Sequence, residues 1–198
     1  MSKTILDWGC GDAKVPGAFG IDNVSLPGVD MVRDLLNVPY PFQANSADEI
    51  YLNHVIEHFA LADYQRILRE AYRLLRPNGV LHVRVPHVFS IAAWADPTHK
   101  SAFTFLSGQF LDRRAAKAYY QETDNLWELK QVTARVTWFN WKRYRLRRLD
   151  EWLGSFLARL LNFLLRLPNW PGAADLFVKS VPMFFVEVRW DLVKPMDD

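Results

Sequence analysis

The chain has 198 residues, of which half are hydrophobic, a formal net charge of +2 and one cysteine, Cys10. A single cysteine excludes an internal disulfide framework and is typical of a reducing compartment. The small net charge gives no support for a nucleic-acid partner. No stretch approaches the ~20 uninterrupted apolar residues of a membrane span, and the first residues lack the pattern of a secretory signal. We therefore expect a cytoplasmic protein with a single domain, 1–198, divided into a core over 1–100 and a cap with the last strands over 101–198.

Short strands alternate with loops and one clear helix in the first half of the sequence. Hydrophobic and β-branched residues predict strands over 4–8, 18–21, 29–32 and 49–52. Apolar residues at helical spacing predict a helix over 61–76, which stops at the turn-forming sequence Pro77-Asn78-Gly79. A fifth strand is expected over 80–85. This alternation predicts an α/β fold with a largely parallel sheet.

The second half of the sequence is less regular. We expect a helix over 107–120, strands over 132–141 and 184–193, and a strongly amphipathic helix over 149–167. Packing of this last helix on the core or on a second subunit of a homodimer is the first interpretation. Because five basic residues precede the helix, peripheral contact of 142–167 with an anionic membrane surface is an alternative. The same bases alternate with aromatic residues, as in RNA-binding segments, but the run is short and disfavours nucleic acid.

A glycine-containing turn follows the first expected strand. Gly9-Cys10-Gly11 lies at the carboxyl end of that strand, where open α/β sheets bind ligands and glycines let a ligand approach the backbone. Asp22 ends the second strand, and its carboxylate can accept hydrogen bonds from both hydroxyls of a ribose. Lys14 replaces the third glycine of the dinucleotide pattern, and Asp22 comes sooner than the ~20 residues expected for NAD. The pattern indicates a nucleoside without a pyrophosphate, and a purely structural glycine turn is the alternative.

Four sequence blocks resemble the class I S-adenosylmethionine (SAM)-dependent methyltransferases, in particular small bacterial ones. They are LDWGCG, GID, DEIYLNHVIEHF and REAYRLLRPNGVLHVRVP, within residues 4–100. The resemblance implies a Rossmann-like sheet, mostly parallel with an antiparallel C-terminal strand, a C-terminal helical cap, and SAM as the cofactor. One departure is that little sequence remains between Asp12 and Phe19 for the helix that normally follows the glycine loop. The resemblance implies these cofactor-binding residues: Asp7, Gly9, Cys10, Gly11, Asp22, Asn23, Asp34, Leu35, Asn53 and His54.

Two histidines four residues apart, His54 and His58, enclose Glu57 and raise the alternative of a zinc hydrolase. Such a site needs a continuous helix from His54 to His58 and a third ligand, for which Glu122 or Glu128 could be proposed. The strand that directly precedes these residues is explained better by the methyltransferase resemblance. We therefore expect no metal site.

Two further histidines, His87 and His99, follow the fifth expected strand and are the candidate catalytic residues. A methyltransferase holds the nucleophile in line with the methyl carbon, and a hydroxyl acceptor gains from a general base, often histidine. Because the first, fourth and fifth strands end at one edge of the sheet, we expect His54, His87 and His99 to face one cavity. The expected acceptor is a small molecule, a sugar or a lipid-linked intermediate. A SAM-binding protein without turnover is the remaining alternative.

Overall fold

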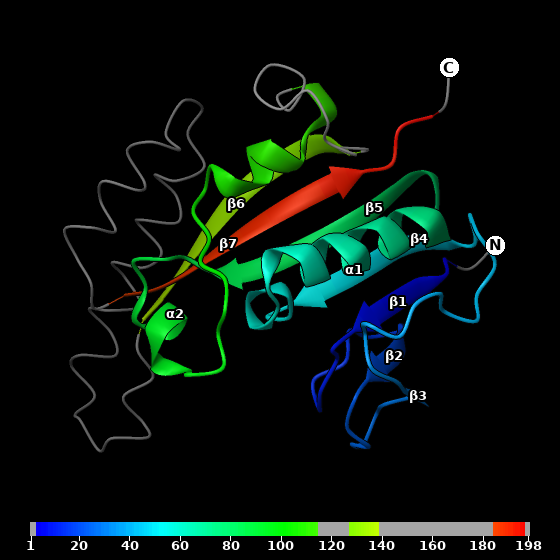
Figure 1. Ribbon diagram of the computed structural model, residues 1–198, viewed down its shortest axis with the longest axis horizontal. Helices are drawn as coiled ribbons and strands as arrows, with labels where there is room; N and C mark the ends of the chain where they lie inside the picture. Colours follow the sequence, from blue (N-terminus) through cyan, green and yellow to red (C-terminus); the bar gives the residue numbers. More distant parts are fainter. Residues whose placement is uncertain (1–2, 115–126, 139–183, 197–198) are drawn as a thin grey trace.

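A computed structural model describes residues 3–114, 127–138 and 184–196, and these residues build one sheet in the order β3-β2-β1-β4-β5-β7-β6 (Figure 1). β7 runs antiparallel to both of its neighbours, whereas the pairs among β1 to β5 are parallel. The expected mixed sheet with an antiparallel C-terminal strand is therefore confirmed. The strands are β1 (Ile5–Trp8), β2 (Phe19–Asp22), β3 (Met31–Val32), β4 (Ala47–Asn53), β5 (Leu75–Pro86), β6 (Glu128–Trp138) and β7 (Phe184–Val193).

One long helix, α1 (Leu61–Leu74), connects β4 to β5 and confirms the helix expected over 61–76. The other described helices are short, and no helix lies between Asp12 and Phe19. Of the helix expected over 107–120, residues 107–111 form a short 3₁₀ helix. The expected amphipathic helix and the basic residues before it, 142–167, lie outside the described residues. Among the described helices, none is long and apolar enough to cross a membrane. The helices are η1 (Ile56–His58), α1 (Leu61–Leu74), α2 (Ile91–Ala95) and η2 (Ser107–Leu111).

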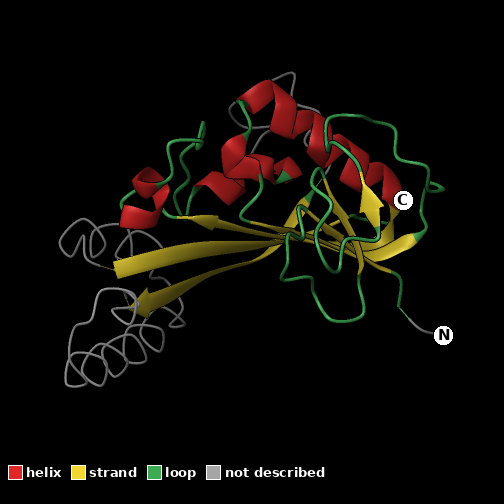
Figure 2. Cartoon of the chain, turned by 90° about the horizontal axis from the view of Figure 1, so that it is seen from below, coloured by secondary structure: helices red, strands yellow, loops and turns green. Residues whose placement is uncertain are grey.

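One face of the sheet carries the hydrophobic core. The register places Trp8 beside Leu52, Leu52 beside Val83, and Val83 beside Trp190, so large apolar side chains form a continuous row across four strands. These side chains are completely buried. The apolar stripe of α1 packs into the same cluster, and Figure 2 shows the described helices on this side of the sheet.

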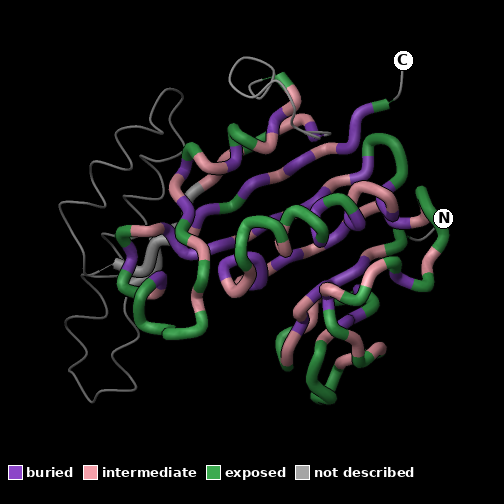
Figure 3. Tube along the Cα trace, viewed as in Figure 1, coloured by how far each residue is buried: buried purple, intermediate pink, exposed green. Residues whose placement is uncertain are grey.

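The opposite face is polar in its central strands. Tyr51, His82 and Asp191 are neighbours in the register. The rings of Tyr51 and His82 stack at 4.4 Å, and His82 Nδ1 lies 2.7 Å from Asp191 Oδ1. Alternation of buried apolar and partly exposed polar residues is typical of a sheet with one covered face. Buried positions therefore concentrate in the central strands, whereas the loops around β2 and β3 are largely exposed (Figure 3).

Candidate functional site

A cavity of about 380 Å³ lies at the carboxyl edge of the parallel strands. This volume is in the range of sites for cofactors and small molecules. Six of the ten residues expected to bind the cofactor line it, and they come from segments that are far apart in the sequence. Val55, His58 and Phe59 line it as well, although sequence reasoning did not include them. The lining residues are Gly9, Asp22, Asn23, Asp34, Leu35, His54, Val55, His58 and Phe59.

Asp22 connects the loop after β1 to the loop after β2. Its Oδ2 accepts a hydrogen bond of 2.9 Å from the backbone N–H of Gly11, and its Oδ1 accepts one of 3.1 Å from Val24 N–H. A carboxylate offers about four lone-pair positions, so about two remain for other donors. The carboxylate therefore holds the glycine loop in place and still has acceptor capacity toward the cavity.

Gly9 is required by the packing as well as by its backbone conformation. Its φ is +69°, in the left-handed region that L side chains rarely adopt. A Cβ at this position would lie 2.6 Å from Val55 Cγ2, closer than atoms can pack. The sequence predicted either ligand approach or a purely structural turn for this glycine. The structure adds that it lets the segment after β4 pack directly against the loop after β1.

Four of the expected cofactor residues, Asp7, Cys10, Gly11 and Asn53, do not line the cavity. Burial raises the pKa of the Asp7 carboxyl, against the effect of the 2.7 Å hydrogen bond that Val15 N–H donates to its Oδ2. Burial also raises the pKa of the Cys10 thiol. Asp7 therefore holds the segment at Val15 in place, and direct cofactor contacts by these four residues stay predictions.

His54 lies at the cavity wall between two carboxylates. Its Nε2 is 3.1 Å from Glu187 Oε1, and its Nδ1 is 3.2 Å from Glu57 Oε1. Burial disfavours the charged imidazole, but the two carboxylates outweigh this effect and raise the pKa of His54 to about 9. At neutral pH His54 is therefore a cation, and it is not available as a general base.

The helix that a zinc hydrolase would need from His54 to His58 is absent. His54 has a φ of +56°, and only the three residues of η1 are helical in this segment. The interpretation with His54 and His58 as two zinc ligands on one helical face is therefore wrong. Glu57 and His58 instead approach His99, and one potential ligand atom from each of these three residues lies within 4.8 Å of the others.

The two candidate catalytic histidines occupy different environments. His87 is completely buried, its ring packs 4.7 Å from the ring of Phe105, and its Nδ1 accepts a hydrogen bond from Phe89 N–H. His99 is also largely covered, but its ring lies 4.7 Å from the ring of His58, which lines the cavity. Of the three histidines expected to share one cavity, His54 lines it, His99 lies beside it, and His87 is part of the core. The catalytic role of His87 and His99 stays a prediction.

Comparisons with known proteins agree with this fold. A family model described as a methyltransferase domain matches residues 23–83. A search of curated proteins gave no significant match. A SAM-dependent methyltransferase from Archaeoglobus fulgidus has a TM-score of 0.56 at 14% identity, over 97% of this chain and 86% of that chain.

Two further solved structures have the same fold. A putative methyltransferase from Bacillus halodurans has a TM-score of 0.57 at 13% identity, over 98% of this chain and 94% of that chain. The phosphoethanolamine N-methyltransferase 2 of Haemonchus contortus, in complex with phosphomonomethylethanolamine and S-adenosylhomocysteine, has a TM-score of 0.52 at 16% identity, over 99% of this chain and 50% of that chain. The family model over residues 23–83 and these structures show that the chain has a fold similar to that of SAM-dependent methyltransferases.

Proposed function

We propose that the cavity binds SAM and that the enzyme transfers its methyl group to a small-molecule, sugar or lipid-linked acceptor. The observation that carries this proposal is the meeting of Gly9, Asp22 and Asp34 on one cavity wall, although the sequence separates them. A nucleoside needs acceptors for its hydroxyls and an apolar surface for its base, and this wall offers both. The carboxylates of Asp22 and Asp34 alone would not indicate a nucleoside. Gly9 beside them, however, lets a ligand approach the backbone closely.

Asp22 would hold the ribose through the acceptor positions that its two backbone hydrogen bonds leave free. Asp34 would face the adenine amino group. Its Oδ1 accepts a hydrogen bond of 2.8 Å from Leu36 N–H, which fixes the side chain and leaves Oδ2 for a ligand. Leu35 is buried at the cavity wall and would pack on the adenine ring.

The acceptor would enter on the side of His58 and His99. His99 Nδ1 lies 2.9 Å from the carbonyl oxygen of Ala93, which can only accept, so this nitrogen carries a proton. Its Nε2 is then the nitrogen of the neutral ring that can face an acceptor group. We therefore assign to His99 the role of base or orienting group for the acceptor, and the core position of His87 gives it no part in this step.

Calorimetric titration with S-adenosylhomocysteine and with SAM, in buffer that contains EDTA, tests the cofactor assignment. We expect one equivalent to bind, and we expect Asp22→Asn to weaken binding about 10- to 100-fold, because each hydrogen bond to a charged group contributes about 1.5–3 kcal/mol. Asp30→Asn is the matched control. Asp30 also braces this region, through hydrogen bonds from Gly20 N–H and Lys14 Nζ, but it does not line the cavity.

Absence of binding to the native chain, or equal losses in both variants, would overturn the cofactor assignment. Transfer of a labelled methyl group from SAM to a panel of hydroxylated small molecules, free sugars and lipid-linked sugars tests the acceptor. Transfer to one class identifies it. Binding of SAM without transfer to any member of the panel would contradict the proposed acceptor range.

A further inference from the structure

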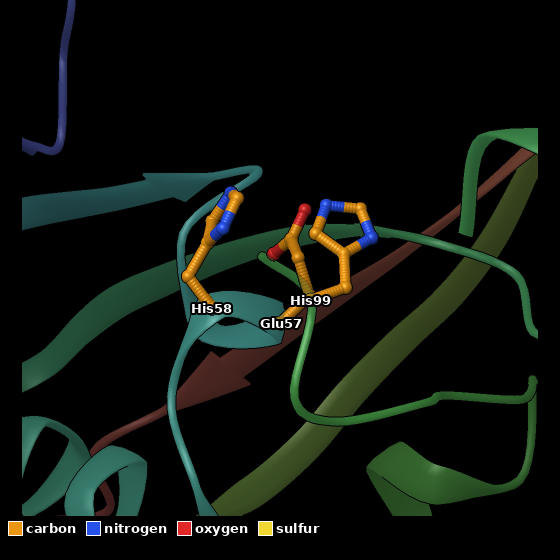
Figure 4. A group of neighbouring side chains, drawn as sticks. All are labelled: Glu57, His58 and His99. Atoms are coloured by element: carbon orange, nitrogen blue, oxygen red, sulfur yellow. The ribbon is translucent and has the colours of Figure 1, made fainter. Parts of the chain in front are cut away.

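Glu57, His58 and His99 form a compact cluster beside the proposed SAM cavity, hereafter the His-Glu cluster. One potential ligand atom from each residue lies within 4.8 Å of the other two. Figure 4 shows the Glu57 carboxylate between the two imidazole rings. His58 also lines the cavity, so the cluster and the proposed cofactor site share a wall.

The hydrogen bonds of the two histidines fix which nitrogen of each ring is free. Thr98 donates its hydroxyl hydrogen to Asp96 Oδ1 at 2.6 Å, so Thr98 Oγ1 acts as acceptor for His58 Nδ1–H at 2.9 Å. His99 Nδ1–H donates to the carbonyl oxygen of Ala93. In the tautomers that these bonds favour, Nε2 of each ring is unprotonated, and that of His99 lies 4.0 Å from Asp96 Oδ2, beyond hydrogen-bond distance. A metal-binding histidine is typically oriented in this way, with its other nitrogen donating to an oxygen.

Glu57 is a buried carboxylate with too few partners. Its side chain is completely buried, and neither carboxylate oxygen accepts a hydrogen bond from the described residues. Its contact with His54 Nδ1, at 3.2 Å, is an ion pair without the angle of a hydrogen bond. A buried carboxylate normally has several donors, because burial without them is costly. The remaining oxygen lone pairs are therefore available to a ligand.

The backbone holds the two halves of the cluster together. The carbonyl oxygen of Glu57 accepts hydrogen bonds from Lys100 N–H at 2.7 Å and Ser101 N–H at 3.1 Å. Ser101 Oγ donates to the carbonyl oxygen of Phe59 at 2.7 Å. The loop that carries His99 is thus bonded directly to the segment that carries Glu57 and His58, and the three side chains share a fixed base.

We propose that the His-Glu cluster binds a divalent transition-metal cation, with Glu57, His58 and His99 as its protein ligands. Two imidazoles and one carboxylate suit such a cation and leave coordination positions open. With bonds of about 2.1 Å, ligand atoms stand roughly 3–3.5 Å apart, so the side chains would close by about 1 Å on binding. The proposal departs from the sequence-based expectation of no metal, because it replaces His54 by a residue of a distant loop.

The use of this cation rests on the proposed function, in which His99 would then orient the acceptor through the cation and would not act as a base. An acceptor hydroxyl bound at an open position would lose its proton to solvent more readily, because the cation stabilises the resulting alkoxide. The oxygen then forms a bond to the methyl carbon of SAM as the carbon–sulfur bond breaks, and the electron pair stays on sulfur. The products are the methyl ether and S-adenosylhomocysteine. The substrate class is therefore a hydroxyl-bearing acceptor whose oxygen can coordinate the cation.

Titration of the EDTA-treated, dialysed chain with Co²⁺, Mn²⁺ or Zn²⁺ tests the site without any acceptor. We expect one equivalent to bind, with visible absorption bands for Co²⁺, and we expect Glu57→Gln and His99→Gln each to lose about 100-fold or more in affinity. His82→Gln is the matched control, because His82 also lies near two carboxylates, Asp191 and Glu49, but outside the cluster. Its affinity should equal that of the native chain.

The outcomes separate this inference from the proposed function, because SAM binding is measured in EDTA. Binding of SAM but of none of the three cations would overturn the metal site and leave the methyltransferase assignment in place. Stoichiometric cation binding that survives both cluster substitutions, or that His82→Gln removes, would also overturn it. Cation binding that needs the cluster, in a chain that binds no SAM, would support the site and contradict the proposed function.

Discussion

The two walls of the cavity differ in how their carboxylates are satisfied. On the first wall, formed by the loops after β1 and β2, Asp22 accepts two backbone hydrogen bonds and joins the loops. On the second wall, formed by η1 and the loop after α2, Glu57 is buried and accepts no hydrogen bond from the described residues. The first wall is therefore complete without a ligand, whereas on the second the charged His54, 3.2 Å from Glu57 Oε1, compensates the buried carboxylate only in part. Substitutions on the first wall should therefore change the stability of the fold and the affinity for SAM. Substitutions on the second wall should change the affinity for a cation.

Gly9→Ala should have the largest effect, and it should act through folding. The added Cβ would meet Val55 Cγ2 at 2.6 Å, and the residue would keep a φ of +69°. We expect a loss of about 2–5 kcal/mol in the free energy of unfolding, from overpacking and the left-handed backbone together. Urea denaturation measures it. Gly11→Ala has a similar φ but no atom within 4 Å of its Cβ, so it should lose only about 1–2 kcal/mol. Equal losses would show that Val55 does not confine the first wall.

Glu57→Gln should separate the walls most clearly. In the native chain, a cation at 100 times its Kd should raise the free energy of unfolding by about 2.7 kcal/mol. The variant should gain nothing from the cation, and in EDTA it should be at least as stable as the native chain, because a neutral amide is less costly to bury than a charge. Asp22→Asn, on the first wall, should respond to the cation as the native chain does. Denaturation with and without cation checks both, and a gain in Glu57→Gln would contradict the difference between the walls.

The first wall could be predicted from the sequence because its signals are local. Gly9 and Asp22 lie thirteen positions apart in the printed sequence; Gly9 directly follows β1 and Asp22 ends β2, and open parallel sheets bring such strand ends together. The missing helix between them also followed from length alone. Asp34 and Leu35 were placed by the resemblance rather than by periodicity, and both line the cavity.

The second wall could not be predicted because it depends on contacts between distant residues. His54 adopts a φ of +56°, which is uncommon for histidine, and this turns the chain so that His58 meets His99 instead of pairing with His54. His87 and His99 both follow β5, and packing against residues such as Phe105, more distant along the chain, is what places His87 in the core. The hydrophobic periodicity of the sequence predicts neither the turn at His54 nor the core position of His87.

Strand β5 shows the same limit outside the site. The turn residues Pro77-Asn78-Gly79 predict that the strand starts after them, yet it begins at Leu75. The backbone N–H of Asn78 donates to the carbonyl oxygen of Lys194, and Lys194 N–H donates to Gly79. A partner more than a hundred residues away thus extends the strand through residues whose local preference is a turn.

Thr98→Ala should have a moderate effect that is confined to the second wall. Thr98 Oγ1 lies 2.9 Å from His58 Nδ1 and so orients the ring. We expect cation affinity to fall about tenfold, as for other residues that orient a metal ligand, with SAM affinity in EDTA unchanged. Thr98→Ser retains the hydroxyl and should restore the affinity. Calorimetry with both ligands provides the test, and a loss of SAM affinity of the same size would mean that Thr98 supports the whole cavity rather than the cluster.

The smallest effect should come from the charge on His54, which lies where the two walls meet. Its pKa is raised from 6.5 to about 9, so the folded chain holds the proton more tightly than the unfolded chain. The resulting stabilisation is complete below pH 6.5 and is lost as the pH rises through about 9. Because the side chain is 38% exposed, solvent screens its ion pairs and the contribution is modest.

The free energy of unfolding in EDTA, measured between pH 6 and 10, should therefore fall less steeply for His54→Gln than for the native chain. Other groups titrate in the same range, but they are common to both proteins, so the difference between the two curves isolates His54. With the cation bound, Glu57 would have a second positive partner, and the loss of the His54 proton should then cost less. Identical slopes of unfolding free energy against pH for the two proteins would show that His54 does not compensate the Glu57 charge. The buried carboxylate of the second wall would then have no positive partner among the described residues until a cation binds.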